Sequence, residues 1–148
     1  MSKLYVIDTV AFISFFHEVF DVESKLSVGV RKLLERAFAT SESNIKLSIP
    51  SLVFVEIFEK WFKSEDFAEK FHYEVFERIV QSPNIEIKPI EQEVLENVLH
   101  IGGGLLDHDL HDKIILASAI MLNCPLITTD QEIIRYVNRN PVIPKTIN

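Results

Sequence analysis

The chain alternates between short apolar runs and longer segments whose apolar residues recur at helical spacing. The short runs predict β-strands at residues 3–7, 45–49, 85–90 and 125–128, with a last strand near 142–143. The helical spacing predicts helices at residues 9–20, 25–39, 51–62, 66–80, 91–101, 113–122 and 131–138. Strands that alternate with helices indicate a mostly parallel sheet with helices on both faces. We therefore expect an α/β three-layer sandwich, formed by a single domain over residues 1–148.

Acidic residues lie beside or within several of these apolar segments. They are Asp8, Glu56, Asp112 and Asp130. Asp8 and Asp130 directly follow predicted strands, Glu56 lies in a predicted helix, and Asp112 stands at the start of one. Buried carboxylates are costly unless they are paired, and clustered carboxylates usually hold a cation. Because sites in such sheets lie at the carboxyl ends of the strands, we expect these four side chains to converge in one crevice.

Each acid also has a simpler interpretation. Asp8 could only cap the helix that follows it. Asp130 could be a favourable acid in the first turn of a helix, with Thr129 and Glu132 forming a capping box. Asp112 could be favoured by a helix dipole, and Glu56 could lie on a solvated face. The order of the four along one chain favours a common site.

The segments that carry these acids resemble those of the PIN-domain family of metal-dependent ribonucleases, over nearly the whole chain. The similar segments are Val6-Ile7-Asp8-Thr9, Ser48-Ile49-Pro50 up to Glu56, His111-Asp112 followed by an aliphatic and alanine helix, and Leu126-Ile127-Thr128-Thr129-Asp130. The resemblance implies an endoribonuclease whose catalytic residues are the four acids. After the fourth acid the family often has an acid and a Phe, whereas this chain has Gln131-Glu132-Ile133.

An all-oxygen site suits Mg²⁺ or Mn²⁺ as the cofactor, with Asp8 and Asp112 as direct ligands and with Asp130 and Glu56 completing the site. Many members of the family are the toxin half of a toxin–antitoxin pair of the VapC type. This resemblance implies an RNA substrate and an antitoxin partner. An acidic crevice would attract a basic tail of that partner. His108 and His111 could instead bind zinc beside Asp109, although such a segment is more typical of a solvated loop.

The net charge of −7 argues against a non-specific nucleic-acid binder, but it does not exclude a nuclease, because the 15 Lys and Arg residues could be concentrated near one cleft. No apolar run approaches the ~20 residues that span a bilayer, and the start of the chain has no signal-peptide layout. The single cysteine, Cys124, is expected to be buried. We therefore expect a cytoplasmic protein with no membrane association.

Aromatic residues are unusually frequent in the middle of the chain, at Phe54, Phe58, Phe62, Phe67, Phe71 and Phe76. They are expected to lie in the core or at a subunit interface rather than to stack on bases. Their number exceeds what a core of this size should need, and a large exposed apolar patch usually marks an interface. We therefore expect a homodimer.

Three other function classes remain open. A haloacid-dehalogenase-type phosphatase also begins with a strand that ends in an Asp, but it needs a second Asp where this chain has Val10. A His-Asp phosphohydrolase could use His72, His108-Asp109 and Asp130, but that class is all-helical. A catalytically weak interaction module would keep the fold and use its acids to bind a basic tail. Release of fragments from RNA, compared with hydrolysis of a phosphomonoester, separates these classes.

Overall fold

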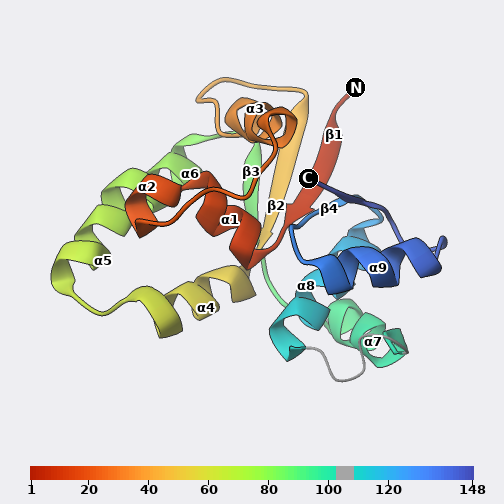
Figure 1. The fold of residues 1–148 in the computed structure, drawn as a ribbon. Helices are drawn as coiled ribbons and strands as arrows, with labels where there is room; N and C mark the ends of the chain where they lie inside the picture. Colours follow the sequence, from red (N-terminus) through yellow and green to blue (C-terminus); the bar gives the residue numbers. More distant parts are fainter. Residues whose placement is uncertain (103–108) are drawn as a thin grey trace.

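The computed structural model describes residues 1–102 and 109–148, and a parallel five-stranded sheet forms its centre. The strands are β1 (Lys3–Ile7), β2 (Ile45–Pro50), β3 (Ile85–Lys88), β4 (Leu126–Ile127) and β5 (Thr146–Ile147), in the spatial order β3-β2-β1-β4-β5. Each neighbouring pair is parallel. Helices cover both sides of the sheet, so the predicted three-layer fold class is confirmed (Figure 1).

Strand β2 is more deeply buried than its alternating pattern indicates. In β2 the expected core residues Ile45, Leu47 and Ile49 are buried, but so is Ser48, which lies on the opposite face. The prediction of a half-buried strand is therefore wrong for β2. The strand lies between β1 and β3, and helices pack on both faces of the sheet, so Ser48 is covered as well as the core residues.

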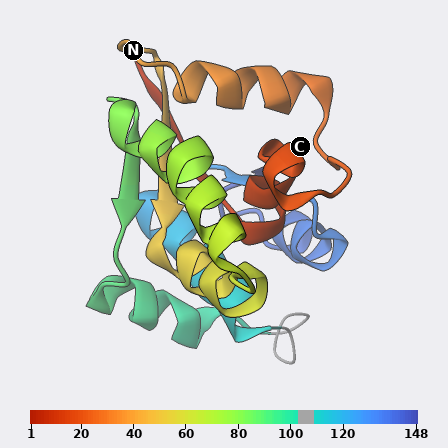
Figure 2. The same cartoon turned by 90° about the vertical axis from the view of Figure 1, so that its left-hand side faces the viewer.

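One side of the sheet carries the helices from the first half of the chain (Figure 1). They are α1 (Thr9–Phe15), α2 (His17–Phe20), α3 (Val28–Ala37), α4 (Ser51–Trp61), α5 (Glu65–Phe71), the π-helix η1 (His72–Phe76) and α6 (Glu77–Gln81). Figure 2 shows α3 across the top of the molecule and the continuous rod from α5 to α6 in front of the sheet. The predicted helix over 9–20 breaks at Phe16, and the predicted helix over 66–80 contains a π turn.

The other side carries α7 (Gln92–His100), α8 (Leu110–Leu122) and α9 (Gln131–Arg139) (Figure 1). The last strand lies at Thr146–Ile147, so its predicted position near 142–143 is wrong. Val142 is 94% exposed there, whereas Thr146 pairs with Leu126 of β4. The expected helix start at residue 51 is correct, but Pro50 occupies the cap position and makes no side-chain cap bond.

The aromatic residues of α4, α5 and η1 form one connected cluster. Phe54 and Phe71 are buried, and Phe62, Phe67 and Phe76 pack against the core. Their rings contact one another mostly edge to face, at centroid distances such as 5.3 Å between Phe62 and Phe71. Of the six, Phe58 is exposed, at 46%. The core therefore accounts for most of the aromatic surplus, and the homodimer stays a prediction that this surplus no longer supports.

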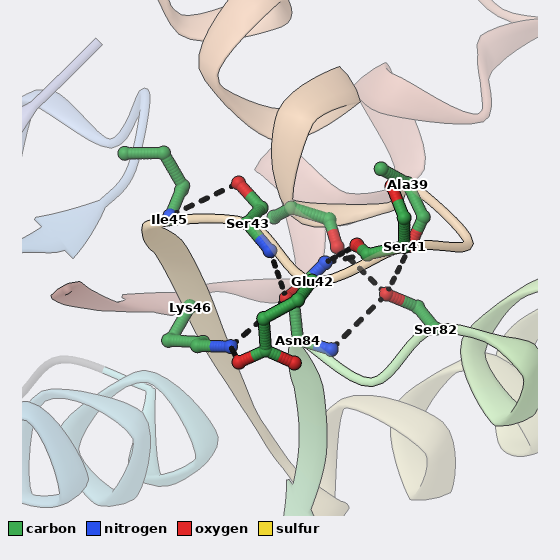
Figure 3. A network of polar contacts seen from close by, with 9 residues as sticks. Ala39, Ser41, Glu42, Ser43, Ile45, Lys46, Ser82 and Asn84 are labelled. Carbon is green, nitrogen blue, oxygen red and sulfur yellow. Dashed lines mark hydrogen bonds and ion pairs between the residues drawn. The ribbon is translucent and has the colours of Figure 1, made fainter.

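A buried polar network joins the loop before β2 to the loop before β3 (Figure 3). The Asn84 amide donates to the carbonyl oxygens of Ser41 at 2.9 Å and Ala39 at 3.4 Å, and its oxygen accepts from the Ser43 N–H at 2.8 Å. The Lys46 ammonium donates to that oxygen as well, at 2.9 Å. Asn84 is 3% exposed. These bonds fix where β2 enters the sheet, and therefore where α4 begins at its other end.

None of the helices in the described part of the chain combines the length and the apolar character that a bilayer span requires. Cys124 is buried, as expected, and burial raises the pKa of its thiol to about 11.

Candidate active site

Asp8 lies at the end of β1 and caps α1. Its Oδ1 accepts the Ala11 N–H at 2.8 Å, and its Oδ2 accepts the Thr128 hydroxyl from the end of β4. The residue is 2% exposed. The interpretation as a cap and the interpretation as a site residue are thus compatible, because the cap bond uses one oxygen and also fixes the direction of the carboxyl group.

The pKa of Asp8 is raised from 3.8 to about 7. Burial is the largest cause, because it removes water from the charged form. The hydrogen bonds from Thr128 and Ala11 oppose the rise, while the negative charges of Asp112 and Asp130 add to it. Three of the four predicted acids therefore lie close enough to interact, although more than half of the chain separates Asp8 from the other two.

Asp130 is held by the start of α9. Its Oδ1 accepts the N–H groups of Glu132 at 2.9 Å and Ile133 at 3.2 Å, so Asp130 is itself the N-cap. The capping box with Thr129 at the cap is therefore wrong. The Thr128 hydroxyl explains why Asp130 rather than Thr129 is the cap. It accepts the Asp130 N–H at 3.0 Å while it donates to Asp8. One threonine thus positions two of the acids.

Glu56 projects from the buried face of α4 and is 7% exposed, so the interpretation as a solvated residue is wrong. Its Oε1 accepts the Thr9 hydroxyl at 2.9 Å. Its Oε2 lies 3.7 Å from the Lys60 ammonium and 3.8 Å from His111 Nδ1. Glu56 and Asp112 line the same pocket, so Asp112 links Glu56 to the group around Asp8.

Sequence reasoning missed the residues that hold Glu56. Lys60 stands one turn after Glu56 in the same helix, a spacing that predicts an ion pair. Thr9 directly follows Asp8 at a helix start, which is the available signal for a second polar residue near the site. His111 Nδ1 is buried without a hydrogen-bond partner and faces Glu56 and Asp109. Asp109 is the N-cap of α8, with its Oδ1 accepting the His111 N–H at 2.8 Å. His108 of the zinc alternative lies outside the described residues.

The donor set suits a hydrated hard cation rather than a fully enclosed one. Within residues 1–102 and 109–148, no three His, Cys, Asp or Glu side chains form a group that could hold a metal ion by themselves. Mg²⁺ needs only one or two direct carboxylates and keeps several waters. Asp112 and Asp130 lie close enough to Asp8 for their charges to act on its carboxyl group. The residues present therefore fit Mg²⁺ or Mn²⁺ held partly through water.

Comparisons with known proteins find one matching family and several similar folds. A sequence model described as PIN domain matches residues 5–138. No curated protein sequence gives a significant match. Among solved structures, DNA-bound VapBC from Salmonella typhimurium is similar with a TM-score of 0.65 and 15% identity, over 99% of this chain and 98% of that chain.

Two further solved structures are similar over the full length. VapBC2 from Rickettsia felis, bound to a DNA fragment of its promoter, gives a TM-score of 0.64 at 16% identity and covers 99% of this chain and 100% of that chain. VapBC-1 from nontypeable Haemophilus influenzae gives 0.63 at 13% identity, over 99% of this chain and 98% of that chain. At this identity the likeness concerns the fold.

Proposed function

Because the chain belongs to the PIN domain family, we propose that it is a Mg²⁺- or Mn²⁺-dependent endoribonuclease and the toxin of a toxin–antitoxin pair. The observation that carries the proposal is the group formed by Asp8, Asp112 and Asp130 at the carboxyl ends of β1 and β4. Burial is the largest cause of the raised pKa of Asp8, and the negative charges of Asp112 and Asp130 add to it, so a bound cation would be favoured here. Phosphodiester cleavage is the chemistry that such a group serves.

The chain's own residues prepare the site for that chemistry. Thr128 and the Ala11 N–H hold the Asp8 carboxyl in one orientation, and the start of α9 holds Asp130. Thr9 fixes one oxygen of Glu56 from the neighbouring helix. When bound, a divalent cation supplies Lewis-acid activation of water and of the phosphodiester. Preorganised carboxylates then need no rearrangement during the reaction.

The first test compares two substrates with and without metal. The protein should release fragments from RNA when Mg²⁺ or Mn²⁺ is present and should not do so in EDTA. A generic phosphomonoester should stay intact under the same conditions. Its hydrolysis would instead indicate a phosphatase. Absence of RNA cleavage with either metal, or faster hydrolysis of the monoester than of RNA, would contradict the proposed activity.

The proposed partner is an antitoxin with a basic tail. The chain carries a net charge of −7 and gathers several acids in one crevice, which focuses a negative potential. An Arg guanidinium matches a pair of carboxylates with two parallel hydrogen bonds. The similar solved structures are VapBC complexes, which supports a protein partner for this chain too.

An Arg-rich peptide is therefore expected to compete with Mg²⁺. Titration of the peptide should inhibit RNA cleavage, and a higher Mg²⁺ concentration should reverse the inhibition. In Asp8→Asn, which removes one charge of the crevice, thermal melts should show weaker stabilisation by the peptide. A Lys- and Arg-free peptide of equal length is the control. Equal peptide affinity with and without saturating Mg²⁺ would place the peptide outside the crevice.

A further inference from the structure

A pocket of about 270 Å³ adjoins the acidic group, between the starts of α1 and α8 and the end of α4. Glu56 and Asp112 form the wall that it shares with the candidate active site. Val10, Ile13 and Trp61 form an apolar wall, and Lys60 adds one cation. Its volume lies just below the roughly 300–1,000 Å³ of typical small-ligand sites. A pocket of this size suits one nucleotide rather than a folded element of RNA.

Trp61 gives this pocket an aromatic wall in a fixed orientation. The residue is half-buried at the end of α4, and its ring packs edge to face on Phe20 with 5.1 Å between centroids. Base–aromatic stacking contributes roughly 1–3 kcal/mol per base in single-stranded nucleic-acid sites. A base that enters the pocket would meet an aromatic side chain which is already held in place.

Two charged groups complete the pocket. The Lys60 side chain is 61% exposed, with its ammonium 3.7 Å from Glu56 Oε2, so it stays near the acids while it faces solvent. Asp109 is fixed because Oδ1 caps α8, and its side chain is 55% exposed. An ammonium suits a phosphate oxygen, whereas a carboxylate accepts hydrogen bonds from amino groups on base edges.

We propose that this pocket holds the base of an unpaired nucleotide next to the cleaved phosphodiester, with the base on Trp61 and a phosphate oxygen on Lys60. The inference rests on the proposed nuclease function and adds to that site a subsite for one base. The Asp109 carboxylate favours bases that carry an amino group over uracil, which has none. Because Glu56 and Asp112 line both regions, a nucleotide in the pocket lies within one nucleotide of the acidic group.

The single tryptophan of the chain makes binding measurable without cleavage. In Asp8→Asn with Mg²⁺, the tetranucleotides rA₄, rC₄ and rU₄ are titrated while the fluorescence of Trp61 is followed. We expect saturable quenching by rA₄ and rC₄, and at least roughly threefold weaker binding of rU₄. Quenching by an Arg-bearing apolar peptide but by none of the three oligonucleotides would assign the pocket to a protein partner and overturn the inference.

Kinetics with matched variants test the same pocket in the active protein. Trp61→Leu is expected to raise KM for unpaired RNA by roughly five- to tenfold with a smaller change in kcat, and Trp61→Phe by less. Phe62→Leu changes the neighbouring half-buried aromatic residue, which does not line the pocket, and should leave KM unchanged. Lys60→Gln should raise KM and weaken its salt dependence, whereas Lys63→Gln, at an exposed position outside the pocket, should do neither.

The outcomes separate this inference from the proposed function. Quenching by rA₄ and rC₄ in a protein that cleaves no RNA would support the nucleotide pocket and overturn the nuclease. The pocket would be overturned, with the nuclease left standing, by two results together. They are RNA cleavage with wild-type KM in Trp61→Leu, and no quenching of Trp61 fluorescence by the oligonucleotides in Asp8→Asn. Thermal melts of both Trp61 variants identify any loss of folding, and the titration in Asp8→Asn does not depend on them.

Discussion

Asp8→Asn is expected to abolish metal-dependent RNA cleavage while it stabilises the metal-free protein. Asn keeps an oxygen that can accept the Ala11 N–H, so the cap of α1 survives. It loses the charge that a divalent cation needs from the most buried acid of the group. Loss of this proposed direct ligand should reduce cleavage by on the order of a hundredfold or more, measured as fragments released from RNA with Mg²⁺ or Mn²⁺.

The stability effect of this variant should depend on pH. The pKa of Asp8 is about 7 in the folded chain, against 3.8 for an ordinary Asp, so the folded protein binds this proton more tightly than the unfolded chain does. Stability of the metal-free wild type should therefore fall as the pH rises from about 4 to 7. The Asn variant has no such proton to lose. Its advantage should be small near pH 4 and reach roughly 2–4 kcal/mol above pH 7.

Thermal melts at pH 4.5 and pH 8 without metal measure this difference, which corresponds to several degrees in Tm for a chain of this size. Added Mg²⁺ should then raise the Tm of the wild type more than that of Asp8→Asn. Asp66→Asn is the matched control, because it neutralises an exposed acid in the first turn of α5, outside the site. Cleavage by Asp8→Asn at the rate of Asp66→Asn would contradict the assignment of Asp8.

The sequence predicted the position of the acids better than the contacts around them. Asp8 and Asp130 follow apolar runs, and the parallel topology brings the ends of such strands together, so local pattern and one topological rule were sufficient. From the sequence, Thr128 is only one residue of the segment that resembles the family before Asp130. Its hydroxyl bonds to the Asp130 N–H, two positions away, and to Asp8, 120 positions away. Nothing in the local pattern encodes the second contact.

Two of the three errors in the fold have the same origin. Val142 and Ile143 form an apolar pair, but the last strand lies at Thr146–Ile147, where pairing with β4 is available. Periodicity indicates that residues 66–80 are helical, yet it does not distinguish an α turn from the π turn at His72–Phe76. The half-buried pattern of β2 failed because the burial of Ser48 depends on which strands lie beside it. For the last strand and for β2, a partner that is distant in the sequence decides.

Asn84→Ala should be among the most destabilising single substitutions in this chain. It removes the donors to the Ser41 and Ala39 carbonyl oxygens and the acceptor for the Ser43 N–H, in a place where Asn84 is 3% exposed. Backbone groups left without partners cost roughly 1–3 kcal/mol each when buried, and water can reach part of this loop. We expect a loss of about 2–4 kcal/mol, measured by urea or thermal unfolding.

The network also connects this stability to the site, because Asn84 fixes the start of β2 and α4 begins directly after the end of β2, at Ser51.

Asn84→Asp tests the hydrogen bonds that Asn84 donates separately from those that it accepts. It keeps the acceptor for Ser43 and Lys46 but turns a second oxygen toward two carbonyl oxygens, so it should destabilise at least as much at pH 7 and recover partly when the carboxyl is protonated below about pH 4. Asn97→Ala removes a bond from an Asn amide to the Glu93 carbonyl on the surface of α7 and should change stability by less than about 0.5 kcal/mol. If Asn84→Ala unfolds at the same urea concentration as Asn97→Ala, the network does not hold β2 and β3 in place.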